Sequence, residues 1–182
     1  MRNRASSISF TLLLLFSSPI VMSTALASPQ SSSANDLIDQ TCNNTPFFDL
    51  CSRILHSNPV PPSNPNDMAL IMIKNIEENA TDTLNYIQEL IKRTSDHQLE
   101  RQLSLCAEDY IPIVKYDLPQ AVDALNRRNF PFASYSINYA GKEVDDCNKK
   151  FSGSQSPVAD RNEIMRRLVG VTVAIIKLLH VM

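Results

Sequence analysis

Glycine is scarce in this sequence: three of the 182 residues are Gly, and tryptophan is absent. Phosphate-binding loops and the nucleophile elbow of hydrolases are built around closely spaced glycines, and none of the motifs G-x-x-x-x-G-K, G-x-G-x-x-G and G-x-S-x-G occurs. Tight hairpin turns also favour glycine, and no segment sustains the alternation of polar and apolar residues that is typical of strands. The sequence therefore argues against phosphate-binding loops, against a hydrolase of that kind and against a β-sheet protein.

A large excess of one charge is also missing, since 17 Lys and Arg stand against 19 Asp and Glu. No basic stripe runs along a predicted element, so we expect no nucleic-acid partner. The three histidines, His56, His97 and His180, lie on separate predicted elements, and none has a nucleophile beside it in a recognisable setting. We therefore expect a protein that is not an enzyme and that holds no cofactor or metal.

No hydrophobic run is long enough to suit a membrane span. Residues 1–27 combine a basic start, an apolar middle and a small-x-small ending, which is typical of a secretory signal peptide. A membrane anchor is the disfavoured alternative, because Ser17, Ser18 and Pro19 interrupt the apolar run and leave it short of the roughly 20 residues that a span needs. We expect a secreted chain with no membrane partner.

The rest of the sequence predicts helices behind a polar tail. Residues 28–34 are rich in Ser, and we expect them to be mobile. Residues 35–58 predict a helical hairpin, and the run of prolines after it predicts an extended linker. Over residues 67–182 apolar positions recur at steps of three and four, which is typical of the seams of an antiparallel bundle. The predicted fold is all-α: one domain (35–182) in which an antiparallel four-helix bundle follows an N-terminal α-hairpin.

Local signals mark where the bundle helices begin and break. Asp67 is the predicted cap of the first bundle helix. Pro112 and Pro119 fall inside the second, where an interior proline costs about 3 kcal/mol, so we expect a kink or a break there. Asp160, with Glu163 three residues later, predicts a capping box at the start of the fourth.

The four cysteines, Cys42, Cys51, Cys106 and Cys147, all follow the predicted signal peptide. An even number in an exported chain predicts two disulfides, whereas a zinc site needs ligand pairs at shorter spacing than these residues have. Cys42 and Cys51 flank the turn of the predicted hairpin, while Cys106 and Cys147 lie in the inward rows of neighbouring bundle helices. The predicted bonds are therefore Cys42–Cys51 and Cys106–Cys147.

Two N-glycosylation sequons begin at Asn43 and Asn79. Asn79 is the preferred candidate, because Asn43 adjoins a cysteine and is followed by Pro46. Motifs this short also arise by chance, so ordinary unmodified asparagines are the alternative interpretation.

Many short segments also carry a resemblance to a known family. They are Leu37-Ile38-Asp39-Gln40-Thr41-Cys42-Asn43-Asn44-Thr45-Pro46, Cys51, Ser57-Asn58-Pro59, Leu70-Ile71-Met72, Leu105-Cys106-Ala107-Glu108-Asp109-Tyr110, Leu118-Pro119-Gln120-Ala121, Ala124-Leu125, Asp146-Cys147 through Phe151, and Ser156-Pro157. Together they resemble the plant invertase and pectin methylesterase inhibitor family over essentially the whole mature chain. The resemblance implies an α-hairpin ahead of a four-helix bundle, with the two disulfides given above. It also implies a non-catalytic inhibitor of a carbohydrate-active enzyme of the cell wall or vacuole.

The resemblance points to the residues before the third bundle helix as the target contact. The opening segment looks more like the invertase-inhibiting branch of the family, which carries a Pro-Lys-Phe tripeptide in this turn that reaches into the active site of the target. The corresponding residues are Phe130, Pro131 and Phe132, preceded by Arg127 and Arg128. Proline stands where the lysine is expected, so either Arg128 supplies a cation to the paired carboxylates of a glycosidase cleft or the inhibition of invertase is lost. The alternative is that the turn is an ordinary helix connector.

We therefore expect a secreted protein that binds an acid invertase as a monomer in a 1:1 complex and occludes its active site, in the apoplast or in the vacuole. A rigid bundle loses little ordering entropy on binding, and aromatic residues at its tip are typical anchors. Pectin methylesterase is the alternative target. A small helical carrier of an apolar ligand is a more distant alternative.

Overall fold

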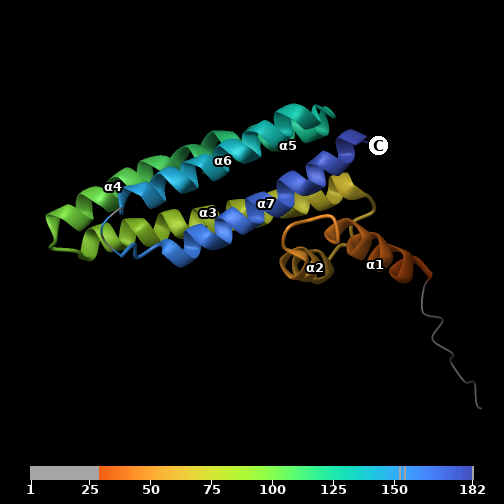
Figure 1. The fold of residues 1–182 in the computed structure, drawn as a ribbon, viewed down its shortest axis with the longest axis horizontal. Coiled ribbons are helices and arrows are strands. Elements are labelled where there is room, and N and C mark those ends of the chain that lie inside the picture. Colours follow the sequence, from red (N-terminus) through yellow and green to blue (C-terminus); the bar gives the residue numbers. More distant parts are fainter. Residues whose placement is uncertain (1–28, 152, 154, 182) are drawn as a thin grey trace, which may run out of the picture.

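The computed structural model describes residues 29–151, 153 and 155–181, and every regular element within them is helical. The predicted signal peptide at 1–27 lies outside the described residues. In chain order the elements are α1 (Pro29–Cys42), α2 (Phe48–Ser57), α3 (Pro65–Arg93), α4 (His97–Pro112), the π-helix η1 (Ile113–Asp117), α5 (Leu118–Asn126), α6 (Phe130–Lys150) and α7 (Ala159–Val181) (Figure 1). None of the helices in this part of the chain is long and apolar enough to span a bilayer.

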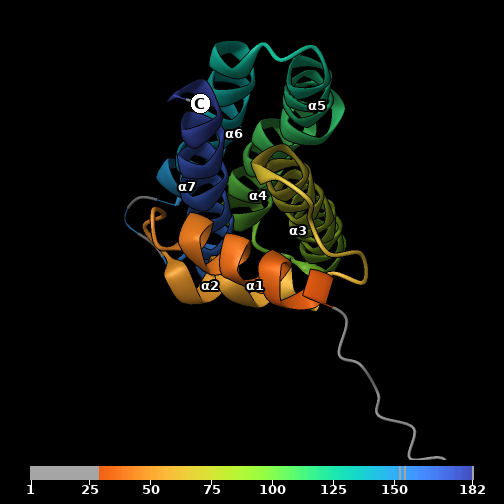
Figure 2. The ribbon, with the colours of Figure 1, turned by 90° about the vertical axis from the view of Figure 1, so that its right-hand side faces the viewer.

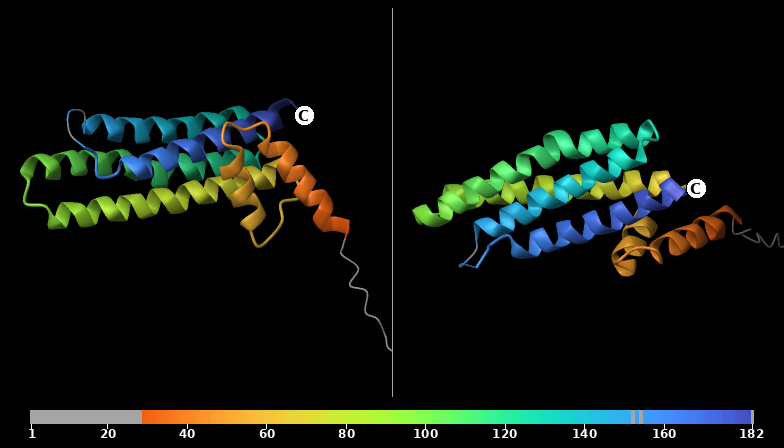
Figure 3. Two further views of the ribbon diagram at one scale, coloured as in Figure 1. Left: turned by 60° about the horizontal axis from the view of Figure 1, so that its bottom comes forward. Right: turned by 45° about the horizontal axis from the view of Figure 1, so that its top comes forward.

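Four long rods form an antiparallel bundle: α3, the continuous path of α4, η1 and α5, then α6 and α7. Each rod packs against two neighbours, so that α3 and α6 lie diagonally across the bundle (Figure 2). The α-hairpin of α1 and α2 lies beside the end of the bundle where α3 begins and α7 ends (Figure 3). The predicted hairpin and bundle are both confirmed.

The first helix begins earlier than predicted. It starts at Pro29 rather than at residue 35, so residues 29–34 of the predicted mobile tail are helical in the structure. Proline suits the first turn of a helix, and neither glycine nor proline occurs again before Pro46. Serine costs a helix only a few tenths of a kcal/mol, about the same as most residues, so nothing in the segment breaks the helix.

Two predicted helix starts are also shifted. At α3 the cap is Asn64, whose Oδ1 accepts a hydrogen bond from the backbone N–H of Asp67 at 3.0 Å, and Pro65 opens the helix. The predicted capping residue Asp67 instead lies inside the first turn. At α7 the helix begins at Ala159, and the carboxylate of Glu163 binds Arg167 (Nε–Oε1 2.8 Å) rather than completing a capping box.

The prolines of the second rod are accommodated by a change of helix type, as the predicted break requires. α4 ends at Pro112, the five residues of η1 widen to a π-helix, and Pro119 falls in the first turn of α5, where its missing N–H costs little. The widened turn places Asp117, a carboxylate, among buried residues.

The core runs the length of the bundle and includes the four cysteines of both disulfides. Cys42 is bonded to Cys51 and Cys106 to Cys147, the two pairings that the helix pattern predicted. Beside the second bond, the hydroxyl of Tyr110 donates to Asn162 Oδ1 at 2.7 Å, and Asn162 Nδ2 donates to Cys147 Sγ at 3.2 Å. Apolar residues fill the seams around this polar group, among them Met68, Met72, Ile76, Ile87, Leu103, Ile113, Ile137 and Ile175.

Candidate functional site

The turn between α5 and α6 closes one end of the bundle. The backbone N–H of Asn129 donates to the carbonyl of Ala124 at 2.8 Å, and the N–H of Arg128 donates to the carbonyl of Leu125 at 3.0 Å. This pair of bonds is the Schellman motif, which ends a helix by placing one residue in the left-handed region. The motif fixes the backbone of the turn, so the side chains that it carries project from a rigid support.

Arg128 occupies the left-handed position, with φ of 56°, and it is the non-glycine residue with positive φ among those that the structure describes. Glycine is usual at this point of the motif, because a side chain there costs about 1–2 kcal/mol. Arg128 is exposed and forms no ion pair with any described residue, whereas Arg127 is held by Asp123 (Nε–Oδ1 3.0 Å). Of the two predicted arginines, Arg128 is therefore the one without an ion-pair partner among the described residues.

The first turn of α6 presents the other predicted contact residues. The side chain of Asn129 caps the helix by accepting the N–H of Phe132 at 3.3 Å, and Pro131 is exposed at the start of the helix. Phe130 is half-buried and packs against the core, whereas Phe132 is 43% exposed. The turn thus brings all five predicted residues together, with Phe130 as its anchor and Arg128, Pro131 and Phe132 on its outer surface.

A hollow of about 670 Å³ adjoins the turn. It lies between the turn, the start of α3 and the end of α7, and its lining residues are Asn64, Pro65, Asn66, Leu125, Asn126, Arg128, Phe130 and Leu179. The Oδ1 atom of Asn66 is buried and has no hydrogen-bond partner among the described residues. The hollow is therefore lined by the exposed Arg128 and by Asn66, whose buried Oδ1 atom is unsatisfied.

Exposed aromatic residues continue from the turn along α6. The rings of Phe132 and Tyr135 are stacked with centroids 6.1 Å apart, and those of Tyr135 and Tyr139 are 6.2 Å apart. Sequence reasoning named Phe132 but missed both tyrosines. The signal that could have found them is the spacing of three and four residues on the side of the helix that carries no core residue.

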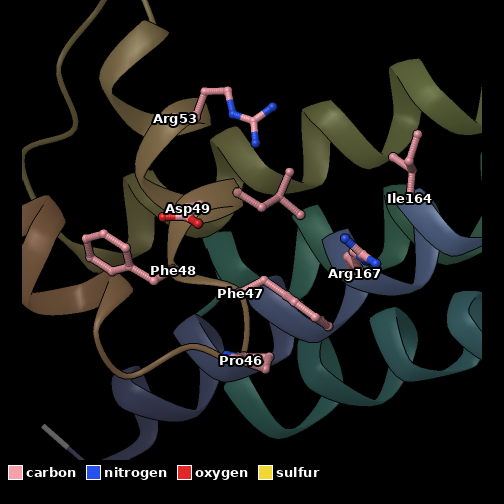
Figure 4. Close-up of a pocket in the computed structure, with 8 residues that line it drawn as sticks. Pro46, Phe47, Phe48, Asp49, Arg53, Ile164 and Arg167 are labelled. Atoms are coloured by element: carbon pink, nitrogen blue, oxygen red, sulfur yellow. The ribbon is translucent and has the colours of Figure 1, made fainter.

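A second hollow, of about 490 Å³, lies between the hairpin and α7 (Figure 4). In it Phe47 lies toward α7, where the guanidinium of Arg167 is 5.5 Å from the ring centroid, while Phe48 points the other way. Arg167 is also bound by Glu163, so its charge is largely satisfied. These contacts attach the hairpin to the bundle. We therefore interpret the hollow as part of the packing between the hairpin and α7, not as a reactive site.

The two sequons differ in their surroundings. Asn43 is exposed in the turn after α1, whereas Asn79 is half-buried in α3, where its Nδ2 donates to the carbonyl of Asn75 at 2.8 Å. A glycan is attached through Nδ2, so the structure gives Asn43 the more accessible position, although the sequence favoured Asn79. Both sites stay predictions.

The chemistry that the turn can perform is recognition. Its outer side chains are a guanidinium, a proline ring and a phenyl ring, none of which is a nucleophile or a general acid or base near neutral pH. No group of three or more His, Cys, Asp or Glu suited to a metal ion occurs among the described residues. The turn can insert a cation and an aromatic ring into a cleft in another molecule.

Comparison with known proteins gives a consistent picture. Residues 36–175 match the family described as "Plant invertase/pectin methylesterase inhibitor". Over 144 residues the chain is 35% identical to "Cell wall / vacuolar inhibitor of fructosidase 1" of Arabidopsis thaliana, a match that covers 79% of this chain and 69% of that protein. Two crystal structures of pectin methylesterase inhibitors from Arabidopsis, the first of a mutant form, have TM-scores of 0.68 and 0.61, with 77% and 78% of this chain and 95% of theirs covered. Their sequence identities of 18% and 19% show the fold alone.

Proposed function

The chain belongs to the plant invertase/pectin methylesterase inhibitor family, and from that premise we propose that it binds an acid invertase and blocks the active site with the α5–α6 turn. The family is one of inhibitors, not of enzymes. The choice of target rests on the relative whose name includes fructosidase. At 35% identity this relative supports a shared function, whereas the two crystal structures show the fold alone. Its name also supports a secreted chain that acts in the cell wall or the vacuole.

The observation that carries the proposal is Arg128. A side chain in the left-handed region is strained, and such strain persists at sites where function requires that residue. The arginine stands where glycine would relieve the strain, and it is exposed without an ion-pair partner among the described residues, four residues before the exposed Phe132. Glycosidase clefts hold paired carboxylates, so a guanidinium in such a cleft forms strong charge-assisted hydrogen bonds.

The test is an inhibition assay of the mature protein against an acid invertase at acidic pH, with pectin methylesterase assayed in parallel. We expect sucrose hydrolysis to be suppressed through a 1:1 complex. Inhibition of pectin de-esterification alone would replace invertase by pectin methylesterase as the target. Inhibition of neither enzyme would overturn the proposal.

Two matched variants test the role of Arg128. Arg128→Gly removes the cation and relieves the strained backbone, so the melting temperature should hold or rise while the inhibition constant rises at least tenfold, because a hydrogen bond to a charged group contributes about 1.5–3 kcal/mol. Arg127→Ala removes the neighbouring arginine and should change inhibition less than threefold. Arg128→Lys should retain part of the inhibition. Equal inhibition by Arg128→Gly and the parent would show that the turn is not the contact.

A further inference from the structure

Three aromatic side chains form an outward-facing row on α6. Phe132, Tyr135 and Tyr139 are 43%, 62% and 39% exposed, and the ammonium of Lys142 lies 5.4 Å from the ring centroid of Tyr139 at the far end. We call Phe132, Tyr135 and Tyr139 the aromatic row. The hydroxyls of both tyrosines have no hydrogen-bond partner among the described residues.

The core of the bundle does not account for the aromatic row. Successive helical residues are about 100° apart, so residues 132, 135 and 139 fall within one narrow arc of α6. The core-facing residues occupy a neighbouring arc centred about 120° away; they are Ala133, Ser136, Ile137, Ala140, Val144 and Cys147. The row therefore lies outside the buried arc through which α6 packs against α4, α5 and α7.

The stability of α6 does not account for the aromatic row either. Neighbouring aromatic pairs on a helix surface contribute only about 0.2–0.5 kcal/mol each. Against this gain, the three rings leave about 300 Å² of side-chain surface exposed, taking about 200 Å² for each side chain. A contiguous patch of that size equals the largest apolar patches of many monomeric proteins, which are often functional.

The position of the aromatic row beside the α5–α6 turn indicates which molecule it binds. Phe132 belongs both to the α5–α6 turn and to the row, which then continues for ten residues to Lys142, a length of about 15 Å. A stable interface needs about 800 Å² on each partner, more than the three outer residues of a turn provide. The row supplies adjoining area on a rigid support, and tyrosine is among the residues that contribute most to binding.

We propose that the aromatic row binds the rim of the active-site cleft of the same target enzyme while the α5–α6 turn occupies the cleft. This inference rests on the proposed function. The matching surface on the enzyme is apolar, with carbonyl or carboxylate oxygens placed to accept the two tyrosine hydroxyls. Lys142 is already bound by Asp146 (Nζ–Oδ2 3.3 Å), so it closes the row without requiring a further acid on the partner.

The experiment compares Tyr135→Ala, Tyr139→Ala and the double variant with Tyr86→Ala. Tyr86 is the matched control, because it is 36% exposed and lies on α3, diagonally across the bundle from α6. Affinity for the invertase is measured by direct binding and by inhibition, and folding by circular dichroism and thermal unfolding. We expect each row variant to weaken binding at least fivefold and the double variant at least twenty-five-fold, with melting temperatures within a few degrees of the parent. Tyr86→Ala should bind as the parent does.

The outcomes separate the two proposals. If Arg128→Gly weakens inhibition while the row variants match Tyr86→Ala, the row is not a contact and the proposed function stands. If the row variants lose affinity while Arg128→Gly does not, the row is the main contact and the role of the turn is refuted. Should the parent protein bind neither invertase nor pectin methylesterase, both proposals fail. Tyr135→Phe and Tyr139→Phe keep the rings, so a partial loss would assign the remainder to the hydroxyls.

Discussion

Asp117 is a carboxylate that the bend of the second rod holds in an unfavourable place. It lies in η1 with 7% of its surface exposed, and its Oδ2 atom has no hydrogen-bond partner among the described residues. Burial, with a smaller contribution from the negative charge of Glu143, raises the pKa of Asp117 to about 6. In the unfolded chain the same carboxyl has a pKa near its ordinary value of 3.8. The residue therefore links folding to pH.

The sign of this linkage predicts a protein that is more stable in acid. Between about pH 4 and pH 6 the folded state binds the proton of Asp117 more tightly than the unfolded state, so stability falls as the pH rises through this window and levels off above it. Asp117→Asn cannot ionise. Relative to the parent, its free energy of unfolding should therefore improve from pH 4 to pH 7 by an amount on the order of 1–3 kcal/mol. Denaturant unfolding at four or more pH values measures the difference.

Asp82→Asn is the matched control, because Asp82 is an exposed aspartate on α3. Over the same pH range Asp117→Asn should gain stability relative to Asp82→Asn. A parallel slope for both variants would show that Asp117 titrates normally in the folded protein.

At the scale of elements, α6 and α7 lie close together at Gly141. A Cβ atom built on Gly141 would lie 2.9 Å from Cγ1 of Val169 on α7, closer than Cβ atoms in proteins come to a non-bonded neighbour. Val169 is β-branched and 8% exposed, so it has little freedom to turn aside. The absence of a side chain at this position therefore sets the distance between the two rods.

Gly141→Ala should destabilise the protein by about 1 kcal/mol, because overpacking costs about 1–3 kcal/mol and the better helix propensity of Ala returns only about 1. Gly170→Ala is the matched helical control. Its nearest neighbours would be 3.5 Å away, an ordinary contact, so the variant should be neutral or more stable. Combining Gly141→Ala with Val169→Ala should recover the overpacking cost, and a double-mutant cycle in chemical denaturation measures that coupling. Additive effects would mean that the two residues do not compete for space.

The helices and both disulfides could be predicted because apolar periodicity records which face of each element is buried. Helix starts were less accessible: Asn64 and Asp67 both suit a cap, and the sequence does not show which side chain reaches the free N–H groups. The five turn residues followed from the family resemblance. The left-handed backbone of Arg128 could not be predicted, because it depends on how the turn closes. The aromatic row with Tyr135 and Tyr139 could not be predicted either, because these side chains take no part in the core.

At the scale of the whole molecule, the α5–α6 turn and the hairpin occupy the same end of the bundle but on opposite sides (Figures 1 and 2). The hairpin therefore leaves the turn and the aromatic row uncovered. Its own disulfide, Cys42–Cys51, closes a local loop with a separation of 9 residues, whereas Cys106–Cys147 joins two rods of the bundle across a separation of 41. The two bonds thus stabilise different parts of the fold.

Removal of each disulfide should lower the free energy of unfolding by a different amount. In the chain-entropy description, a loop of the longer kind contributes about 4 kcal/mol and one of the shorter kind about 2.6 kcal/mol. Replacing Cys106 and Cys147 by Ala also removes one of the two acceptors of the Asn162 amide, which keeps its bond to Asn148 Oδ1. The variant without Cys106–Cys147 should therefore lose more stability in denaturant than the variant in which Cys42 and Cys51 are both Ala.

The variant in which Cys42 and Cys51 are both Ala, the hairpin variant, should still inhibit with nearly the affinity of the parent, because the turn is supported by α5, α6 and their core contacts. A loss of inhibition in the hairpin variant, at unchanged helicity of the bundle, would show that the hairpin takes part in binding the target.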